Sequence, residues 1–187
     1  MRDFYARKAK SEGFRARSAY KLLNIQRKFH IFKKGYTTLD LGAYPGSWSQ
    51  VASYFGVVYA VDKKKINPIK NCIILNKDIF DKDLFKYLPK SVDVIISDIS
   101  PNISGIREKD QFEFMHYYKR TKKIIVKSLK KDGNFVFKVF QGSYYNNILM
   151  DLKHVFKIVR TYKPKASKDK SKEMYIIALS YNKTSSN

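Results

Sequence analysis

Short apolar runs that alternate with amphipathic segments constrain the fold of this chain more than any other feature of its sequence. Runs with the length and composition of strands lie at residues 37–41, 57–61, 72–75, 92–97 and 134–140, around Ile158, and at residues 174–180. Helical candidates lie between them, at residues 48–55, 82–88, 110–129 and 144–156. Strands that alternate with helices predict an α/β fold with a mainly parallel sheet.

The chain of 187 residues has the size of one domain, and no repeat or linker divides it. Residues 1–17 contain many basic residues and two acids, which predicts a basic N-terminal arm. An amphipathic helix is expected after Ser18 as its cap, and Gly133, at positive φ, is expected to end the long helix. Residues 163–172, with five lysines and one acid, predict a basic loop, and residues 182–187 a frayed tail.

The charge of the chain predicts a polyanionic partner. Lysine and arginine total 38 against 16 acidic residues, a formal net charge of +22. Nucleic acid is the leading expectation and an anionic membrane surface the second, although a biased genome composition would also produce part of this excess. No apolar run approaches the roughly 20 residues that span a bilayer, and the N-terminus lacks the apolar core of a secretory signal. A soluble protein that is not exported is therefore expected.

Disulfide and metal chemistry are not expected. Cys72 is the only cysteine, which excludes an intramolecular disulfide and fits a reducing compartment. His30, His116 and His154 are scattered without the spacing of metal ligands. We therefore interpret the histidines as structural or surface residues and predict no metal site.

A strand, a glycine-containing turn and a helix follow one another at residues 39–48, where parallel sheets place ligands. The turn lacks the G-x-G-x-x-G pattern, and Pro45 removes an amide from any phosphate cradle, which disfavours a nicotinamide or flavin cofactor. Acids close or follow the next three strands, at Asp62, Asp78 and Asp98. Carboxylates suit ribose hydroxyls, an adenine amino group and a sulfonium, so a crevice lined by them predicts S-adenosylmethionine. Asp62 and Asp78 as simple turn or cap residues are the alternative.

Lys138 interrupts an otherwise apolar run at residues 135–140, and lysine is rarely buried unless it is paired or functional. Burial and a second cation such as Lys21 favour the neutral amine, whereas Asp98 or Glu173 nearby would favour the ammonium, and the sequence leaves this balance open. A neutral lysine is a usable general base, able to take a proton from a substrate hydroxyl. A lysine on an edge strand that reaches solvent is the alternative.

Five motifs follow one another along the chain: Arg17-Ser18-Ala19-Tyr20-Lys21-Leu22, Leu41-Gly42-Ala43-Tyr44-Pro45-Gly46-Ser47-Trp48-Ser49-Gln50, Ser97-Asp98-Ile99-Ser100-Pro101-Asn102, Phe137-Lys138-Val139-Phe140-Gln141-Gly142 and Ser171-Lys172-Glu173-Met174-Tyr175. Together they resemble the FtsJ-like (RrmJ-type) ribosomal RNA methyltransferases over nearly the whole chain. The resemblance implies a Rossmann-like S-adenosylmethionine-dependent methyltransferase fold, with a seven-stranded sheet and helices on both faces. Tyr44 and Ser47 depart from the pattern, which usually has a small residue at the first position and often glycine at the second.

The resemblance also implies which residues form the site. By motif matching, the Lys-Asp-Lys-Glu tetrad of the family would be Lys21, Asp98, Lys138 and Glu173. Lys138 would be the proton acceptor, and Tyr175 matches a neighbour of the active site. The cofactor would be held by Gly46, Trp48, Asp62, Asp78 and Asp98.

The activity that the resemblance implies is 2′-O-methylation of a ribose, of a uridine in large-subunit ribosomal RNA, because residues 138–142 and 173–175 look like that branch. A tRNA anticodon-loop methyltransferase and, more remotely, an mRNA cap methyltransferase would use the same chemistry. A non-catalytic RNA-binding ribosome-assembly factor and a nicotinamide-dependent oxidoreductase are the alternatives from other classes. RNA is expected to lie across residues 2–21 and 163–172, the protein is expected to be a monomer, and cytoplasm, nucleolus and organelle all stay open as its location.

Overall fold

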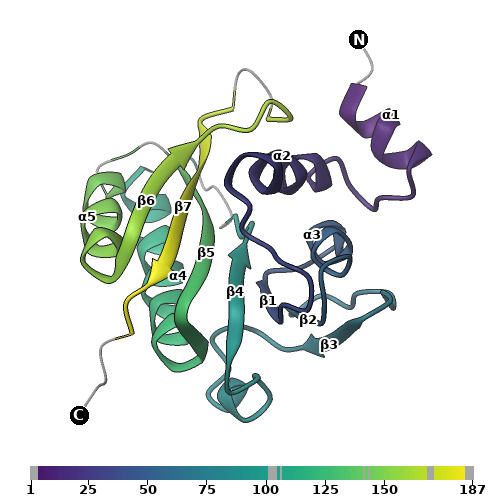
Figure 1. The fold of residues 1–187 in the computed structure, drawn as a ribbon. Coiled ribbons are helices and arrows are strands. Elements are labelled where there is room, and N and C mark those ends of the chain that lie inside the picture. Colours follow the sequence, from purple (N-terminus) through teal and green to yellow (C-terminus); the bar gives the residue numbers. More distant parts are fainter. Residues whose placement is uncertain are drawn as a thin grey trace.

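The computed structural model describes residues 4–100, 105, 107–140, 142, 144–167 and 171–183. A seven-stranded sheet in the order β3-β2-β1-β4-β5-β7-β6 forms its centre (Figure 1). The strands are β1 Thr38–Leu41, β2 Val58–Asp62, β3 Cys72–Asn76, β4 Val92–Ser97, β5 Leu129–Phe140, β6 Phe156–Tyr162 and β7 Glu173–Tyr181. Strands β1 to β5 pair in parallel, whereas β7 is antiparallel to both β5 and β6. The predicted α/β fold with a mainly parallel sheet is confirmed.

Helices cover both faces of this sheet (Figure 1). They are α1 Phe4–Ser11, α2 Ala19–Phe29, α3 Ser47–Ala52, α4 Arg107–Ser128 and α5 Tyr145–Val155, with a short 3-10 helix, η1, at Leu84–Lys86. One apolar cluster joins α4 and α5 to Phe135 and Phe137 of β5. A second cluster joins α2 and α3 to the opposite face, where Val136 lies. Interior strands therefore bury both faces, as the continuous apolar runs require.

The alternation of side chains along β5 determines where Lys138 lies. Phe137 and Val139 enter the α4–α5 core, so Lys138 points to the α2–α3 side, as Val136 does. Tyr175 of β7 is the register partner of Lys138 and belongs to the same α2–α3 cluster. Because β5 is an interior strand and Lys138 is buried, the alternative of an edge-strand lysine that reaches solvent is wrong.

Two predicted helices are shorter in the structure. Helix α3 ends at Ala52 rather than at residue 55, because the chain turns at Gly56, where a Cβ would overlap the Tyr36 carbonyl oxygen. The predicted helix at residues 82–88 is reduced to the single turn η1. Arg120 of α4 donates to two carbonyl groups just before this turn, which holds the segment as a loop.

One predicted helix end is confirmed in position and another is wrong. Ser18 stands at the N-cap of α2, as predicted, although its hydroxyl makes no cap hydrogen bond and lies 2.7 Å from the Ser47 hydroxyl. After α4 the chain enters β5 directly, and the residue with positive φ is Asp132, at 59°, rather than Gly133. Gly133 serves close packing, since a Cβ there would come within 2.9 Å of the Asp93 carbonyl oxygen.

The predicted basic arm contains a helix. Residues 1–3 lie outside the described residues, and α1 follows them. Ala9 of α1, Tyr20 of α2 and Ala166 of the predicted lysine loop share a small apolar cluster. The arm and the described start of the loop therefore lie against each other beside α2.

Some predictions reach beyond what the structure describes. Residues 168–170 of the lysine loop and 184–187 of the tail lie outside the described residues. Within the described part of the chain, no helix has the length and apolar character needed to cross a membrane. The same residues hold no group of three or more His, Cys, Asp or Glu side chains placed to bind a metal ion.

Candidate active site

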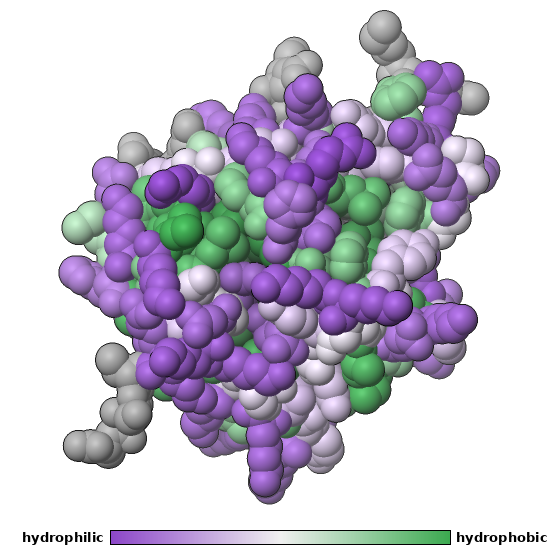
Figure 2. Space-filling model, in the orientation of Figure 1, coloured by the Kyte–Doolittle hydropathy of each residue, from purple (hydrophilic) through white to green (hydrophobic). Residues whose placement is uncertain are grey.

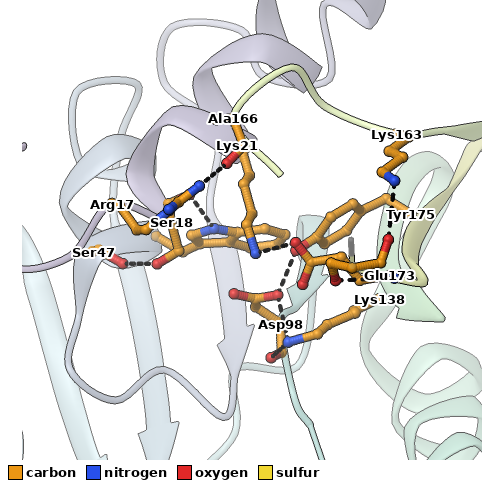
Figure 3. A network of polar contacts seen from close by, with 12 residues as sticks. Arg17, Ser18, Lys21, Ser47, Asp98, Lys138, Lys163, Ala166, Glu173 and Tyr175 are labelled. Atoms are coloured by element: carbon orange, nitrogen blue, oxygen red, sulfur yellow. Dashed lines mark hydrogen bonds and ion pairs between the residues drawn. The ribbon is translucent and has the colours of Figure 1, made fainter. Parts of the chain in front are cut away.

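Four charged side chains meet at the carboxyl edge of the parallel strands, on the side that α2 covers (Figure 3). They are the four residues of the predicted tetrad: Lys21 of α2, Asp98 directly after β4, Lys138 of β5 and Glu173 at the start of β7. They come together because β5 pairs with both β4 and β7. The structure therefore unites residues from both ends of the chain.

Lys138 and Asp98 form the inner ion pair. Lys138 Nζ lies 3.0 Å from Asp98 Oδ1 and donates to the Asp98 backbone oxygen at 2.8 Å. The Lys138 side chain is 9% exposed and that of Asp98 20%. A buried amine requires such partners, and here both belong to a single residue. Asp98 thus fixes the position of Nζ.

Lys21 and Glu173 form the outer ion pair, with Lys21 Nζ 2.6 Å from Glu173 Oε1. Burial alone would raise the pKa of Glu173, but the hydrogen bond and the charge of Lys21 outweigh it, and the charge of Lys138 adds to their effect. The net result is a Glu173 pKa below the usual carboxyl value. Glu173 is therefore ionised at neutral pH and holds the Lys21 ammonium.

Two aromatic side chains, Tyr175 and Trp48, adjoin the ion pairs, and Figure 3 shows Tyr175 beside Asp98. Tyr175 Oη donates to Asp98 Oδ1 at 2.7 Å. Burial, together with the charges of Asp98 and Glu173, raises the pKa of Tyr175 well above its ordinary value, so this hydroxyl stays protonated. The Trp48 ring lies 5.5 Å from the Tyr175 ring, and Trp48 Nε1 donates to the Ser18 backbone oxygen at 2.9 Å. The tetrad is thereby joined to the helix that follows the glycine turn.

A cavity of about 440 Å³ opens beside the inner ion pair. Its lining includes Asp62, Asp78 and Asp98, the three acids at the ends of successive predicted strands. The prediction that these acids line one crevice is confirmed. The volume lies in the range of small-molecule sites, and the three carboxylates can accept hydroxyl and amino hydrogens. Lys63, Lys64 and Lys77 also belong to the lining.

Asp62 holds the glycine turn that forms one wall of this cavity. Asp62 Oδ2 accepts the Tyr44 N–H at 2.9 Å, and Oδ1 accepts the Lys64 N–H at 2.7 Å. Gly42 has φ 71°, and a Cβ there would overlap the Ile99 side chain, so the backbone itself lines the wall. The Asp62 oxygens keep further lone pairs that can accept hydrogen bonds from a ligand.

Gly46 and Trp48, also predicted to hold the cofactor, lie at the far end of the turn. Neither is among the described residues that line the cavity. Gly46 has φ 104°, a conformation that L residues rarely adopt, and Trp48 is 2% exposed. In the structure these residues shape the turn and anchor it, and direct contact with a cofactor stays a prediction.

Asp40 in β1 is an acid that sequence reasoning did not single out, although it stands in an apolar run. It is 1% exposed and accepts the Ser49 hydroxyl at 2.6 Å, which fastens α3 to β1 behind the glycine turn. Burial raises the pKa of Asp40 to about 7, with the hydrogen bond from Ser49 opposing and the charges of Asp98 and Asp62 adding to the rise. Asp40 therefore releases its proton near neutral pH.

Asp40→Asn is expected to flatten the pH dependence of stability. A carboxyl whose pKa is about 3.9 in the unfolded chain and about 7 in the folded protein binds more protons when folded, so stability falls as pH rises between these values. From pH 5 to pH 8 the contribution of Asp40 to the unfolding free energy should fall by on the order of 3 kcal/mol. Urea unfolding of both proteins at the two pH values measures it, and equal slopes would refute the assignment.

Comparison with known proteins is consistent with this geometry. Residues 14–181 match the family described as FtsJ-like methyltransferase. A protein of Methanothrix thermoacetophila named "Ribosomal RNA large subunit methyltransferase E" is 40% identical over 183 residues, which cover 95% of this chain and 72% of that protein.

Solved structures resemble the fold. A Plasmodium falciparum protein described as a ribosomal RNA methyltransferase superposes with a TM-score of 0.79 at 28% identity, covering 90% of this chain and 99% of that one. The Streptococcus mutans protein SMU.1697c, in complex with SAH, has a TM-score of 0.56 at 17% identity, over 87% of this chain and 94% of that one. The second likeness shows the fold alone.

Proposed function

The chain belongs to the FtsJ-like methyltransferase family, and we propose that it transfers a methyl group from S-adenosylmethionine to a ribose 2′-hydroxyl, that of a uridine in large-subunit ribosomal RNA. The observation that carries the proposal is Lys138, a buried amine held by Asp98 at the edge of a cavity whose lining includes Asp62, Asp78 and Asp98. The name of the Methanothrix relative favours ribosomal RNA as the substrate.

The chemistry of the cavity fits S-adenosylmethionine. When bound, this cofactor supplies a methyl carbon that a positively charged sulfur makes electrophilic. Asp62, Asp78 and Asp98 are acceptors for its hydroxyl and amino hydrogens, and the lining also includes Lys63, Lys64 and Lys77. Gly46 and Trp48 keep the turn in the shape that brings backbone to the cavity wall.

Lys138 is the proton acceptor. As an ammonium paired with Asp98, Lys138 has no lone pair, so it can accept a proton only after it has released one to solvent. The neutral amine then has two N–H groups and one lone pair, and Asp98 offers Nζ two acceptors, Oδ1 and the backbone oxygen. With both N–H groups directed to Asp98, the lone pair is left for the 2′-hydroxyl hydrogen. The 2′-hydroxyl proton would move to Nζ as the hydroxyl oxygen bonds to the methyl carbon, whose bond to the cofactor sulfur would break to leave a neutral thioether. The resulting ammonium is stabilised by the adjacent carboxylate.

Lys21 and Glu173 are positioning residues for the ribose. An ammonium and a carboxylate 2.6 Å apart present a donor and an acceptor side by side to the sugar hydroxyls. Alignment of two reacting atoms accounts for a large part of catalysis when no covalent intermediate is formed. Tyr175 contributes by holding Asp98, and through it Lys138.

RNA reaches the site across the arm, α2 and the lysine loop. Arg17 Nη2 donates to the Ala166 backbone oxygen at 2.6 Å, so the loop lies against the segment that leads to Lys21. Lys8 and Lys165 are exposed on these elements and suit backbone phosphates. Figure 2 shows hydrophilic side chains spread over much of the face that carries α1, α2 and the loop, around smaller apolar areas.

The proposal predicts a single mapped product. Labelled methyl from S-adenosylmethionine is offered to unmethylated large-subunit ribosomal RNA, to assembled large subunits and to tRNA, and the modified ribose is located by nuclease digestion. The expected result is one 2′-O-methyluridine in the large-subunit RNA. Transfer to tRNA alone would show that the proposed reaction is right and the proposed substrate wrong. Transfer to none of the three would refute the proposal.

A further inference from the structure

Arg15 joins the N-terminal arm to the glycine turn. It lies between α1 and α2, and its Nη1 donates to the Pro45 oxygen at 3.0 Å and to the Asn67 oxygen at 2.9 Å. Its Nη2 donates to the Pro68 oxygen at 2.8 Å. All three acceptors are backbone carbonyls, from the turn and from the loop after β2. A planar guanidinium holds such a set through its fixed fork of donors, which an ammonium lacks.

A second connection runs through Gln50 of α3. The Arg15 N–H donates to Gln50 Oε1 at 2.9 Å, and Gln50 Nε2 donates to the Gly13 oxygen at 2.9 Å. A Cβ at Gly46 would come within 2.8 Å of Arg15 Nη1, so a larger residue at this position would displace the guanidinium. Residues 13–15 and the glycine turn are therefore one hydrogen-bonded unit.

Helix α1, which precedes residues 13–15, carries a basic surface. In α1, Arg7, Lys8 and Lys10 are exposed, whereas Ala9 packs in the cluster with Tyr20. We propose that Arg15 is a positioning residue that couples the two ligands, so that RNA bound along the arm raises the affinity of the cavity for the cofactor. The inference rests on the proposed function, in that it takes RNA as the ligand of the arm.

The sign of the coupling follows from the contacts. RNA that fixes the arm also fixes Arg15, and through it the Pro45 carbonyl and the turn that walls the cavity. A cofactor that binds afterwards meets a turn that is held more firmly, so less conformational freedom is lost on binding. Coupling of binding free energies is reciprocal, and factors of about 5 to 150 are usual, so RNA should tighten cofactor binding at least about fivefold.

The test compares, in four proteins, the dissociation constant of the cofactor product without RNA with that in the presence of RNA. The dissociation constant of labelled S-adenosylhomocysteine is determined by equilibrium dialysis, without RNA and with saturating large-subunit ribosomal RNA. The unmodified protein should give a ratio of at least about five. Arg15→Lys keeps the charge but loses the fork, and Gln50→Ala keeps the guanidinium but loses the backbone link, so both should bring the ratio close to one. Lys157→Gln removes an exposed cation of β6, which takes no part in the arm or the glycine turn, and should keep the ratio.

Each outcome separates this inference from the proposed function. RNA that binds and is methylated without changing the dissociation constant would overturn the coupling and leave the methyltransferase intact. An undiminished ratio in Arg15→Lys, with RNA bound, would also overturn it. RNA that fails to bind at all would overturn the coupling together with the proposed RNA substrate. Urea midpoints of the variants show that each is folded under the conditions of the measurement.

Discussion

Replacing Lys138 with alanine is expected to lower kcat for methyl transfer by about 10²- to 10⁴-fold, the range for removal of a general base. The reason is that the Lys138 lone pair is the group placed to take the ribose proton. The two Asp98 oxygens that contact Nζ accept its hydrogens and hold it in position. The dissociation constant of S-adenosylhomocysteine should change by less than about threefold, because Lys138 is not among the described residues that line the cavity. Single-turnover methyl transfer measures the chemical step directly.

Two companion variants separate base catalysis from charge. Lys138→Arg keeps the cation but cannot be deprotonated in a protein, so it should be as inactive as the alanine variant. Lys157→Ala removes an exposed lysine that pairs with Asp132 at 2.9 Å on the β6 side, and it should retain full activity. Substantial turnover by Lys138→Arg would show that the site needs only a positive charge there.

Replacing Asp62 with alanine is expected to weaken cofactor binding about 100-fold. The carboxylate shapes the turn by accepting the Tyr44 and Lys64 N–H groups and keeps lone pairs for the ligand. One hydrogen bond from the cofactor to this charged acceptor is worth about 1.5–3 kcal/mol. A loss of about 2.7 kcal/mol corresponds to a factor of about 100 in the dissociation constant. Calorimetric titration with S-adenosylhomocysteine measures this change.

The exposed ion pair between Lys157 and Asp132 also provides a control for the loss of a carboxylate. Asp132→Ala removes an aspartate that pairs with Lys157 away from the cavity, and its affinity for S-adenosylhomocysteine should be unchanged. At saturating cofactor, Asp62→Ala should recover most of its kcat because the tetrad is intact. An unaltered dissociation constant in Asp62→Ala would rule out the assignment of this cavity to the cofactor.

The sequence predicted the site best where a charged residue stands in a segment that is expected to be buried. Lys138 stands in an apolar run, and such a charge predicts function because burying it is costly. Strand β4 has the predicted bounds, Val92–Ser97, since a short β-branched run between turns fits little else. Asp40 shows the limit of this reasoning. It is a charged residue in an apolar strand, as Lys138 is, but nothing in the sequence indicates that Ser49 is its hydrogen-bond partner.

The features that could not be predicted depend on contacts with backbone groups or on the register of the strands. The acceptors of Arg15 are carbonyl oxygens, which every residue carries, so no pattern of residue types marks them. The positive φ at Asp132 rather than Gly133 is of the same kind, because both residue types tolerate that conformation and the entry into β5 decides between them. The pairing of Lys21 with Glu173 requires the antiparallel return of β7.

Trp48 gives the protein an optical reporter of its own. It is the only tryptophan in the chain, it is almost fully buried, and it contacts the Tyr175 ring while donating to the Ser18 carbonyl. Selective excitation of its indole therefore yields emission from one place, the junction of the arm, the glycine turn and the tetrad. A ligand that moves any of these three elements changes the surroundings of a single fluorophore, so association can be followed in real time on the unlabelled, unmodified chain.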